Sequence, residues 1–391
     1  MKSWKKSMVI VNNNLDIGGI QRALVNLLNE ISSKFDITLF LFKKSGALLC
    51  EVPDHVKIIE ARGVLRLLGV SQAEARQMGV LYYYLRAVLA LLCRMFHNNF
   101  IIKLLTKSQG MDGKYDVAIS YMQNSYSKMF FGGCNEFVIN SIKAARKISF
   151  VHCDFSNYEG NNKSNRGIYD KFDRIALVSN SCKNSFENVM PHLAGKTACV
   201  YNCCIYEQIK KMANEDPYIY EKGINLLTVA RISEEKGLLR CADIMKKLKR
   251  SGCEFFWHII GDGGQKTELL QKIQENELDD CVIYHGETNN PYRYMKNAST
   301  LLVLSYHEAA PMVFMEAKAL GLPILATNTC SAKEMVEDTK AGIVCDNQEQ
   351  AILELLLKVC KIPQLLRPAV IRADNKIAVK EFCDLVENAY D

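Results

Sequence analysis

The chain has 391 residues, of which 24% are charged, and a formal net charge of +6. A single hydrophobic core rarely supports this length, so two globular domains are expected. The 15 cysteines are odd in number and scattered, without CxxC pairs or the Cys/His spacing that zinc requires. We therefore expect reduced, mostly buried thiols and no metal site.

The N-terminal segment carries basic residues but only four consecutive apolar ones, 8–11, which is too few for the core of a signal peptide. No run of 18 apolar residues occurs in the chain, so no membrane-spanning helix is expected. These features predict a cytoplasmic protein.

Short apolar runs alternate with longer segments of helical period along the whole chain. This alternation is typical of βαβ units and predicts mainly parallel sheets with helices on their faces. The expected strands of the first half are 8–12, 37–42, 56–60, 116–120, 147–152, 174–179 and 197–202, and those of the second half are 224–230, 255–261, 281–286, 300–305, 323–327 and 341–346. The pattern predicts an α/β protein with a first domain at 1–203, a polar linker at 204–223, a second domain at 224–365 and a C-terminal helix at 366–391 that could pack back on the first domain.

Ligands of such sheets bind at the carboxyl ends of the strands, next to helix N-termini. At this edge the first strand is followed by Gly18 and Gly19 and then by a helix expected from Ile20. Two glycines let backbone approach a ligand closely, and the first N–H groups of a helix attract phosphate. Glycines before a helix are also common as simple turn residues. Their spacing differs from the GxGxxG of a dinucleotide site, which argues against NAD or FAD.

The stretch SYHEAAPMVFMEAKALG, 305–321, combines a loop with a helix that we expect to start at about Pro311 and to stop at Gly321. Glu308 lies in the loop and Glu316 on the helix. The backbone N–H groups between them, at the positive end of the helix, suit an anion or sugar hydroxyls. A surface glutamate and an ordinary helix residue would give the same pattern.

The strand expected at 224–230 leads directly to Arg231 and Lys236. Two cations at the carboxyl end of a strand suit a diphosphate, because Arg binds phosphate oxygens as a fork and Lys as a point charge. Their place on the edge that also carries Glu308 favours a ligand site over solvated surface charges.

Together these motifs resemble the retaining glycosyltransferases of family four, which have the GT-B fold of two Rossmann-like domains with mainly parallel sheets facing across a cleft. The resemblance covers nearly the whole chain. It rests on two glutamates with seven residues between them, on the preceding Arg and Lys, on IIGDGG at 259–264, and on GGIQR and FVHCDF in the first half. Ala309 stands where the family usually has glycine, which leaves the identity of the donor sugar open.

The resemblance implies that the first domain binds the acceptor and the second domain the nucleotide-sugar. Glu316 would then hold the ribose hydroxyls and Glu308 a hydroxyl of the transferred sugar, while Arg231 and Lys236 would neutralise the diphosphate. His152 would contact the donor sugar near the acceptor and complete a catalytic set with Glu308, Arg231 and Lys236. The remaining implied residues are Gly18, Gly19, Gly261, Ala310, Pro311, Met312 and Val313 on the donor and Asp154 on the acceptor side.

Glycosyl transfer leaves negative charge on the departing diphosphate, which needs a counter-charge. Many transferases hold a divalent metal with an Asp-x-Asp motif, and none occurs in this sequence. We therefore expect Arg231, Lys236 and helix N-termini to neutralise the charge, with no metal and no cofactor beyond the donor as co-substrate. Retention of the anomeric configuration follows from the resemblance alone.

The predicted function is the transfer of a hexose from a nucleotide-sugar to a glycan or lipid-linked saccharide acceptor, in cell-surface or capsular polysaccharide synthesis. The family's commonest donor is a UDP-sugar, and no nucleic-acid partner is expected. The alternatives are a non-catalytic GT-B subunit that binds a nucleotide-sugar or a partner transferase, and a GT-B epimerase or phosphorylase. The retained charged set argues against the subunit, and the chain is short for a phosphorylase.

Residues 61–110 are the stretch least like the family, with seven Arg or Lys and one acidic residue, Glu74. Their net charge of +6 equals that of the entire chain. Apolar clusters between Arg76, Arg86 and Arg94 have the composition of amphipathic helices that lie on an anionic bilayer. Such binding would place the protein at the inner face of the plasma membrane. The same helices could instead cover the first sheet, with the arginines reaching water, and the sequence leaves both interpretations open.

Overall fold

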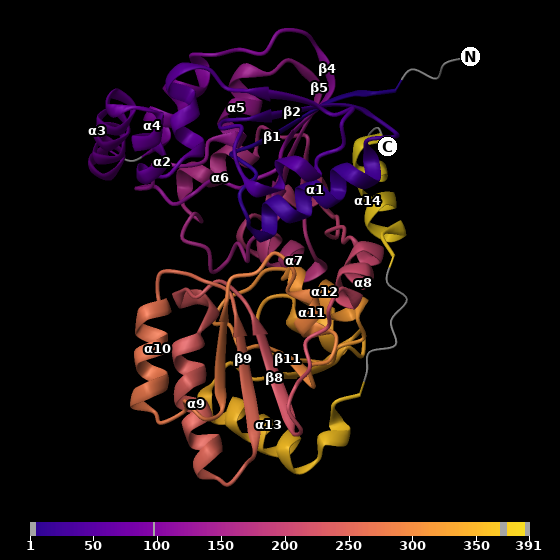
Figure 1. The fold of residues 1–391 in the computed structure, drawn as a ribbon. Coiled ribbons are helices and arrows are strands. Elements are labelled where there is room, and N and C mark those ends of the chain that lie inside the picture. Colours follow the sequence, from indigo (N-terminus) through magenta and orange to yellow (C-terminus); the bar gives the residue numbers. More distant parts are fainter. Residues whose placement is uncertain (1–4, 97, 368–373, 388–391) are drawn as a thin grey trace. The chain divides into compact units, whose positions relative to one another are not determined.

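The computed structural model describes residues 5–96, 98–367 and 374–387. The chain forms two compact units (Figure 1). The first unit comprises the chain through Cys203 together with the segment from Asn375, and the second unit runs from Cys204 to Asp374. Both units are α/β, with parallel strands and helices against the sheets.

The first unit contains a seven-stranded parallel sheet in the order β3-β2-β1-β4-β5-β6-β7. The inner strand that contains Met8 to Asn12 is buried along these residues, because helices cover both faces of a parallel sheet. The strands are β1 (Ser7–Asn12), β2 (Asp36–Leu41), β3 (Lys57–Glu60), β4 (Tyr115–Ser120), β5 (Ala144–Val151), β6 (Arg174–Leu177) and β7 (Thr197–Cys199). The helices are α1 (Gly19–Ile31), α2 (Gln72–Met78), α3 (Val80–Phe96), α4 (Asn98–Lys107), α5 (Cys134–Ser141), α6 (Lys163–Tyr169), α7 (Asn180–Val189) and α14 (Lys376–Glu387), with short turns η1 (Ala47–Glu51), η2 (Gly63–Gly69) and η3 (Pro191–Lys196).

The second unit contains a six-stranded parallel sheet in the order β10-β9-β8-β11-β12-β13. Its strands are β8 (Ile224–Val229), β9 (Phe255–Ile260), β10 (Val282–Gly286), β11 (Thr300–Val303), β12 (Ile324–Thr327) and β13 (Gly342–Cys345). The helices are α8 (Tyr206–Asn214), α9 (Leu238–Arg250), α10 (Lys266–Glu275), α11 (Tyr292–Met295), α12 (Met312–Ala319) and α13 (Glu349–Lys361), with short turns η4 (Glu234–Lys236), η5 (Lys333–Glu337) and η6 (Pro363–Leu365).

Each of the thirteen runs expected to form a strand contains one, and all strand pairs are parallel. The expected α/β fold class is therefore confirmed. Helix boundaries differ by one residue in two places that matter for the site. Helix α1 begins at Gly19 rather than at Ile20, and α12 begins at Met312, with Pro311 in the extended position just before it.

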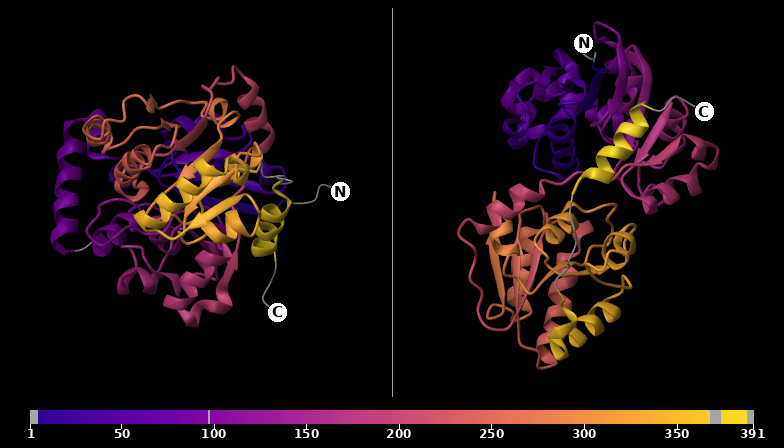
Figure 2. Two further views of the ribbon diagram at one scale, coloured as in Figure 1. Left: turned by 90° about the horizontal axis from the view of Figure 1, so that it is seen from below. Right: turned by 90° about the vertical axis from the view of Figure 1, so that its right-hand side faces the viewer.

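The segment expected as a linker, 204–223, contains α8 and belongs to the second unit, where Ile209 and Ala213 are buried in the core. At the C-terminal end, α14 packs with the first unit against α1, as Figures 1 and 2 show. The ring of Phe382 lies 6.1 Å from that of Phe35 and is fully buried. Arg146 on β5 binds the carbonyls of the last turn of α14 at 3.0 and 3.2 Å.

The strand order reverses at one point in each sheet. In the first unit the reversal lies between β1 and β4, and in the second unit it lies between β8 and β11. In open α/β sheets, ligands bind outside the carboxyl ends of the strands at such a point. In the described part of the chain, no helix is long and apolar enough to cross a membrane.

Candidate active site

The loops that follow β8 and β11 meet at the switch point of the second sheet. The backbone N–H of Tyr306 donates to the carbonyl of Glu235 at 2.9 Å, which ties the two loops together. Gly237 allows this approach. It has a φ of 68°, and a Cβ there would lie 2.9 Å from the carbonyl oxygen of Leu304. Val229 and Val303, which are distant in sequence, thus end neighbouring strands whose loops share one edge.

This contact brings two of the predicted site residues together. The Lys236 ammonium forms an ion pair with the Glu308 carboxylate, and the Ser305 hydroxyl donates to the same carboxylate oxygen at 3.0 Å. The side chain of Glu308 is 12% exposed and that of Lys236 is 24% exposed. Glu308 is therefore a positioned carboxylate on the edge of the sheet, and the alternative of a freely solvated surface glutamate is excluded.

Arg231 and Glu235 complete the charge pattern of the β8 loop. Arg231 is exposed. Burial would raise the pKa of Glu235, but hydrogen bonds from Ser233 and from the backbone, with the charges of Lys236 and Arg231, hold it below its usual value. The Ser233 hydroxyl donates to Glu235 at 2.7 Å. The loop thus carries two cations and an ionised glutamate that fixes its conformation.

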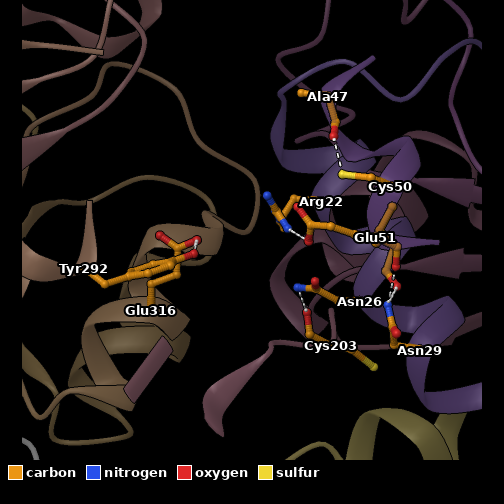
Figure 3. Close-up of polar contacts among 10 residues, drawn as sticks. Arg22, Asn26, Asn29, Ala47, Cys50, Glu51, Cys203, Tyr292 and Glu316 are labelled. Atoms are coloured by element: carbon orange, nitrogen blue, oxygen red, sulfur yellow. Dashed lines mark hydrogen bonds and ion pairs between the residues drawn. The ribbon is translucent and has the colours of Figure 1, made fainter. Parts of the chain in front are cut away.

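Glu316 lies in the second turn of α12, which follows the Glu308 loop. The hydroxyl of Tyr292, on α11, lies 3.3 Å from the Glu316 carboxylate, and Figure 3 shows the two side chains together. Tyr292 is buried. The Ser331 hydroxyl fixes the segment between the two glutamates, because it donates to the carbonyl of Ala309. Of the predicted donor residues here, Pro311 and Met312 are buried, whereas Ala310 and Val313 are half-buried.

Arg240, on α9, supports the loop that carries Glu308. One guanidinium nitrogen donates to the carbonyl of Leu304 at 2.6 Å and another donates to Asn347 at 2.8 Å. The guanidinium also lies over the ring of Tyr306, 3.9 Å from its centroid. Asn347 donates in turn to the carbonyl of Tyr306 at 2.9 Å. The arrangement fixes the backbone on which Glu308 stands.

Gly261 has a structural reason to be glycine. Its φ is 136°, and a Cβ would lie 1.9 Å from the carbonyl oxygen of Ala230. The backbone after β9 therefore runs directly against the backbone that precedes Arg231. Ile232 N–H donates to the carbonyl of Asp262 at 2.9 Å, which continues this contact. Gly261 supports the position of Arg231 whether or not it contacts a ligand.

In the first unit, Gly18 and Gly19 open α1 at the edge next to the switch point. Gly18 caps the helix with extended backbone, and a Cβ on Gly19 would meet no atom within 4 Å. Gly19 is exposed, and neither its backbone conformation nor packing requires glycine there. Arg22, one turn later, forms an ion pair with Glu51 on η1 (Figure 3).

His152 follows β5 and is held against aromatic rings. Its backbone N–H donates to Gln123 at 3.1 Å, and its ring centroid lies 4.8 Å from that of Tyr121. Burial lowers the pKa of His152 to about 3, although a hydrogen bond to the Tyr121 backbone raises it, so the imidazole is neutral at neutral pH. The Nε2 atom is buried and has no hydrogen-bond partner within the described residues. Because the neutral imidazole uses its one N–H on the Tyr121 backbone, Nε2 can accept one further hydrogen bond, as from a hydroxyl group.

Asp154 is occupied by the fold. One carboxylate oxygen accepts a hydrogen bond from Ser185 on α7, and the other accepts one from Asn157 at 2.7 Å. These bonds close the turn after β5 onto α7. The observed contacts give Asp154 a structural role, and its place on the acceptor side stays a prediction.

The structure also identifies site residues that sequence reasoning missed. Tyr292 orients Glu316, and Arg240 fixes the loop of Glu308, yet both lie on other elements and carry no local motif. Ser305 could have been found, because it stands three residues before Glu308. All fifteen cysteines are free. Among the described residues, no group of three or more His, Cys, Asp or Glu could hold a metal ion.

Comparison with known families supports the interpretation of this site. Residues 210–375 match the family described as glycosyl transferases group 1. The match includes both loops at the switch point of the second unit, with Arg231, Lys236, Glu308 and Glu316. The family match therefore covers nearly all of the second unit, which the resemblance expects to bind the nucleotide-sugar.

Relatives in the curated proteins carry names of the same class. The amylovoran biosynthesis glycosyltransferase AmsK of Erwinia amylovora is 29% identical over 163 residues, which are 39% of this chain and 40% of that protein. The matched part thus spans about two fifths of that relative. An N-acetylgalactosaminyltransferase of Campylobacter jejuni, named for an N-acetylgalactosamine-N,N'-diacetylbacillosaminyl-diphospho-undecaprenol substrate, is 24% identical over 353 residues, 85% of this chain and 84% of that protein.

A solved structure resembles nearly the whole chain. The Anabaena protein Alr3699/HepE in complex with UDP and glucose has a TM-score of 0.65 at 16% identity, over 96% of each chain. Together with the two parallel sheets, this likeness establishes the GT-B fold. The expected fold is therefore confirmed at the level of both units.

Proposed function

We propose that this chain is a retaining glycosyltransferase that transfers a sugar from a UDP-sugar to a saccharide or lipid-linked acceptor in the synthesis of a cell-surface polysaccharide. The observation that carries the proposal is the meeting of the β8 and β11 loops. It places a Lys236 and Glu308 ion pair at the switch point, beside Arg231 and the helix that carries Glu316. The group 1 match over 210–375 supports this assignment.

The charges suit departure of a nucleoside diphosphate. Lys236 has three N–H donors, and the ion pair with Glu308 leaves donors that can bind phosphate oxygens. Arg231, exposed on the same loop, supplies a second cation. Cations that are already in place stabilise charge as it develops on the leaving group, without reorganisation during the reaction. In this proposal the two side chains serve without a divalent metal.

The two glutamates bind the two ends of the donor. Glu316, oriented by Tyr292, accepts hydrogen bonds from the ribose hydroxyls, and Glu308 accepts one from a hydroxyl of the transferred sugar. Backbone groups of 309–313 line the same sugar. The donor is a UDP-sugar in this proposal, supported by the Anabaena structure, which contains UDP and glucose. The methyl group of Ala309 narrows the choice of sugar.

A lipid-linked saccharide is the favoured acceptor class. It is supported by the Campylobacter jejuni relative, whose name specifies a diphospho-undecaprenol substrate. Contacts of Gly18 and Gly19 with the diphosphate, and of His152 with the sugar, stay predictions of the resemblance. The neutral imidazole of His152, with its unpartnered Nε2, supports a hydroxyl contact rather than a charge interaction.

Release of UDP from a panel of UDP-sugars tests the proposal without a known acceptor, because water replaces the acceptor slowly. We expect hydrolysis of one or a few donors by the wild-type protein and its loss in Lys236→Ala. A protein that binds UDP but hydrolyses no donor and transfers no sugar would be a non-catalytic GT-B subunit. An epimerised nucleotide-sugar among the products would indicate an epimerase instead.

A further inference from the structure

Helices α3 and α4 of the first unit carry most of the chain's exposed large apolar side chains. Nine of the sixteen such residues in the described part of the chain lie between 80 and 104, each 53% to 77% exposed. They are Val80, Leu81, Tyr84, Val88, Leu91, Met95, Phe96, Phe100 and Leu104. Figure 1 shows α2, α3 and α4 grouped at one side of the first unit.

Most of these side chains line one exposed side of each helix. On α3 the residues 81, 84, 88, 91 and 95 are spaced alternately by three and four, so they lie along one side of the helix. Phe100 and Leu104, four residues apart, continue the pattern on α4. We call these seven residues the apolar face. Exposed apolar side chains gathered in this way commonly mark an interaction site.

The inner side of the two helices is fixed to the unit. Arg86 donates to the carbonyl of Val70 at 2.9 Å, to Gln72 at 3.0 Å and to the carbonyl of Phe130 at 3.3 Å. Cys93 on α3 and Ile102 on α4 are buried. The helices therefore pack on the first unit with one side, in line with the interpretation that they cover part of it. That covering uses the opposite side and leaves the apolar face exposed.

The charge around the apolar face is of one sign. No acidic residue occurs between Glu74 and Asp112, whereas Arg76, Arg94, Lys103 and Lys107 are exposed there. Arg86 does not belong to this set of exposed cations. Its guanidinium is half-buried against backbone carbonyls, and this burial lowers its pKa.

We propose that the apolar face of α3 and α4 docks on an anionic phospholipid bilayer, with its apolar side chains in the interface and the four exposed cations at the headgroups. Amphipathic helices with one apolar side and basic flanks bind membranes in this way. A second copy of the chain fits less well, because pairing two such faces would bring cations of the same sign together. Membrane docking would bring the protein to a lipid-linked acceptor, and this part of the inference rests on the proposed function.

Co-sedimentation of the full chain with vesicles tests the proposal. We expect binding to vesicles of phosphatidylglycerol and phosphatidylcholine, little binding to phosphatidylcholine alone, and release at high salt because screening weakens the attraction. The double variant Arg94→Glu and Lys103→Glu should lower binding at least ~10-fold, since each basic residue contributes on the order of a few-fold. Leu91→Ser with Phe100→Ser should lower it similarly.

Matched controls separate this face from general effects. Arg250→Glu reverses a cation in the last turn of α9, as Arg94→Glu does in the last turn of α3. Ile219→Ser removes a large apolar side chain that is 87% exposed in the second unit. Both controls should bind vesicles like the wild-type chain. Thermal unfolding and UDP-sugar hydrolysis without vesicles should be unchanged in all four variants.

Insertion can be followed without disturbing the fold. The variant Tyr84→Trp places a tryptophan on the apolar face. The fluorescence emission of this tryptophan should shift to shorter wavelength only with anionic vesicles. Equal binding to both vesicle types, no binding, or no spectral shift would overturn the proposal. A dimer that the Leu91→Ser and Phe100→Ser changes dissociate would also overturn it, in favour of a second copy. Vesicle binding without any donor hydrolysis would instead count against the proposed function alone.

Discussion

At the scale of single residues, the donor site depends on side chains that fix one another. Glu308 holds Lys236 in an ion pair that is largely shielded from water, and Ser305 holds Glu308. Removal of either charge leaves the other partly buried without its partner, which costs more than the loss of a surface ion pair. The effects of Lys236 and Glu308 substitutions should therefore not be additive.

Replacement of Lys236 or Glu316 by alanine should abolish transfer and leave the fold intact. Each change removes a contact worth roughly 2 to 4 kcal/mol, which corresponds to a loss of ~30- to 1,000-fold in rate. The measurement is the rate of sugar transfer or donor hydrolysis, with circular dichroism to check folding. Lys333→Ala and Glu254→Ala, at exposed positions, are the matched controls. Near-normal turnover in both site variants would contradict the site assignment.

A buried carboxyl group in the first unit should make stability depend on pH. Burial raises the pKa of Glu136 to about 7, although Asn124 donates to it at 2.6 Å. The folded chain thus prefers the protonated form of Glu136. Its contribution to the free energy of unfolding is fully present below the usual pKa of about 4.5 and is lost as the pH rises to about 7.

The Glu136→Gln variant keeps the side chain neutral. We expect it to unfold at a higher temperature than the wild type at pH 8 and at a similar temperature at pH 5. Thermal melts at both values measure this difference. Glu254→Gln, an exposed glutamate in the second unit, should show neither change. Equal shifts of the melting temperature at both pH values would show that the carboxyl group is not the cause.

At the scale of elements, the loop before α12 illustrates how a helix and two strands position one carboxylate. Arg240 on α9 contacts Leu304, Tyr306 and Asn347, which lie on separate segments around β11 and β13. Thr327, at the end of β12, donates to the carbonyl of Ser305 at 2.6 Å. These contacts tie the end of β11 to its neighbours, so Glu308 stands on rigid backbone rather than on a free loop.

Helix α12 also carries a lysine that is unfavourable in its charged form. Burial lowers the pKa of Lys318 to about 8, while Glu334 acts in the opposite direction. Since the unfolded value is 10.5, the free energy of unfolding should rise as the pH increases from about 8 to 10.5. The cost at neutral pH is at most roughly 3.5 kcal/mol, from about 1.4 kcal/mol for each pKa unit.

The Lys318→Met variant should therefore be more stable than the wild type at pH 7 and nearly equal to it at pH 10.5. Urea unfolding at the two pH values measures the difference. Lys333→Met changes an exposed lysine in the same unit and should leave the free energy of unfolding unchanged at both. A destabilised Lys318→Met at pH 7 would indicate that the ammonium makes favourable contacts that outweigh its burial.

At the scale of the whole molecule, the proposed chemistry needs only the chain and its two substrates. In the proposed mechanism Arg231 and Lys236 supply the positive charge at the leaving group, so transfer should be unchanged by an excess of EDTA. The measurement is the initial rate with EDTA, with Mg²⁺ and with Mn²⁺, after dialysis against EDTA. A strict requirement for added Mn²⁺ would mean that a metal neutralises the diphosphate and that the two cations have another role.

Much of the architecture was available from the sequence. Runs such as MVIVN and TLLVLS contain buried strands and are therefore mostly apolar, and this local pattern located every strand. The order of charged residues after those strands located Arg231, Lys236, Glu308 and Glu316, because loops at the carboxyl ends of parallel strands share an edge. The starts of α1 at Gly19 and of α12 at Met312 were predicted to within one residue.

The tertiary structure decided what depends on the pairing of distant segments. The neighbouring positions of β8 and β11, and with them the ion pair of Lys236 and Glu308, follow from the order of the whole sheet. Tyr292 and Arg240 reach the site from other elements, and α14 returns to the first unit. The composition of residues 61–110 indicated amphipathic helices, but only packing could show that Arg86 holds one side of α3 and that the apolar face is left exposed. Periodicity is a local property of the chain, whereas which surfaces become buried depends on every element that packs around them.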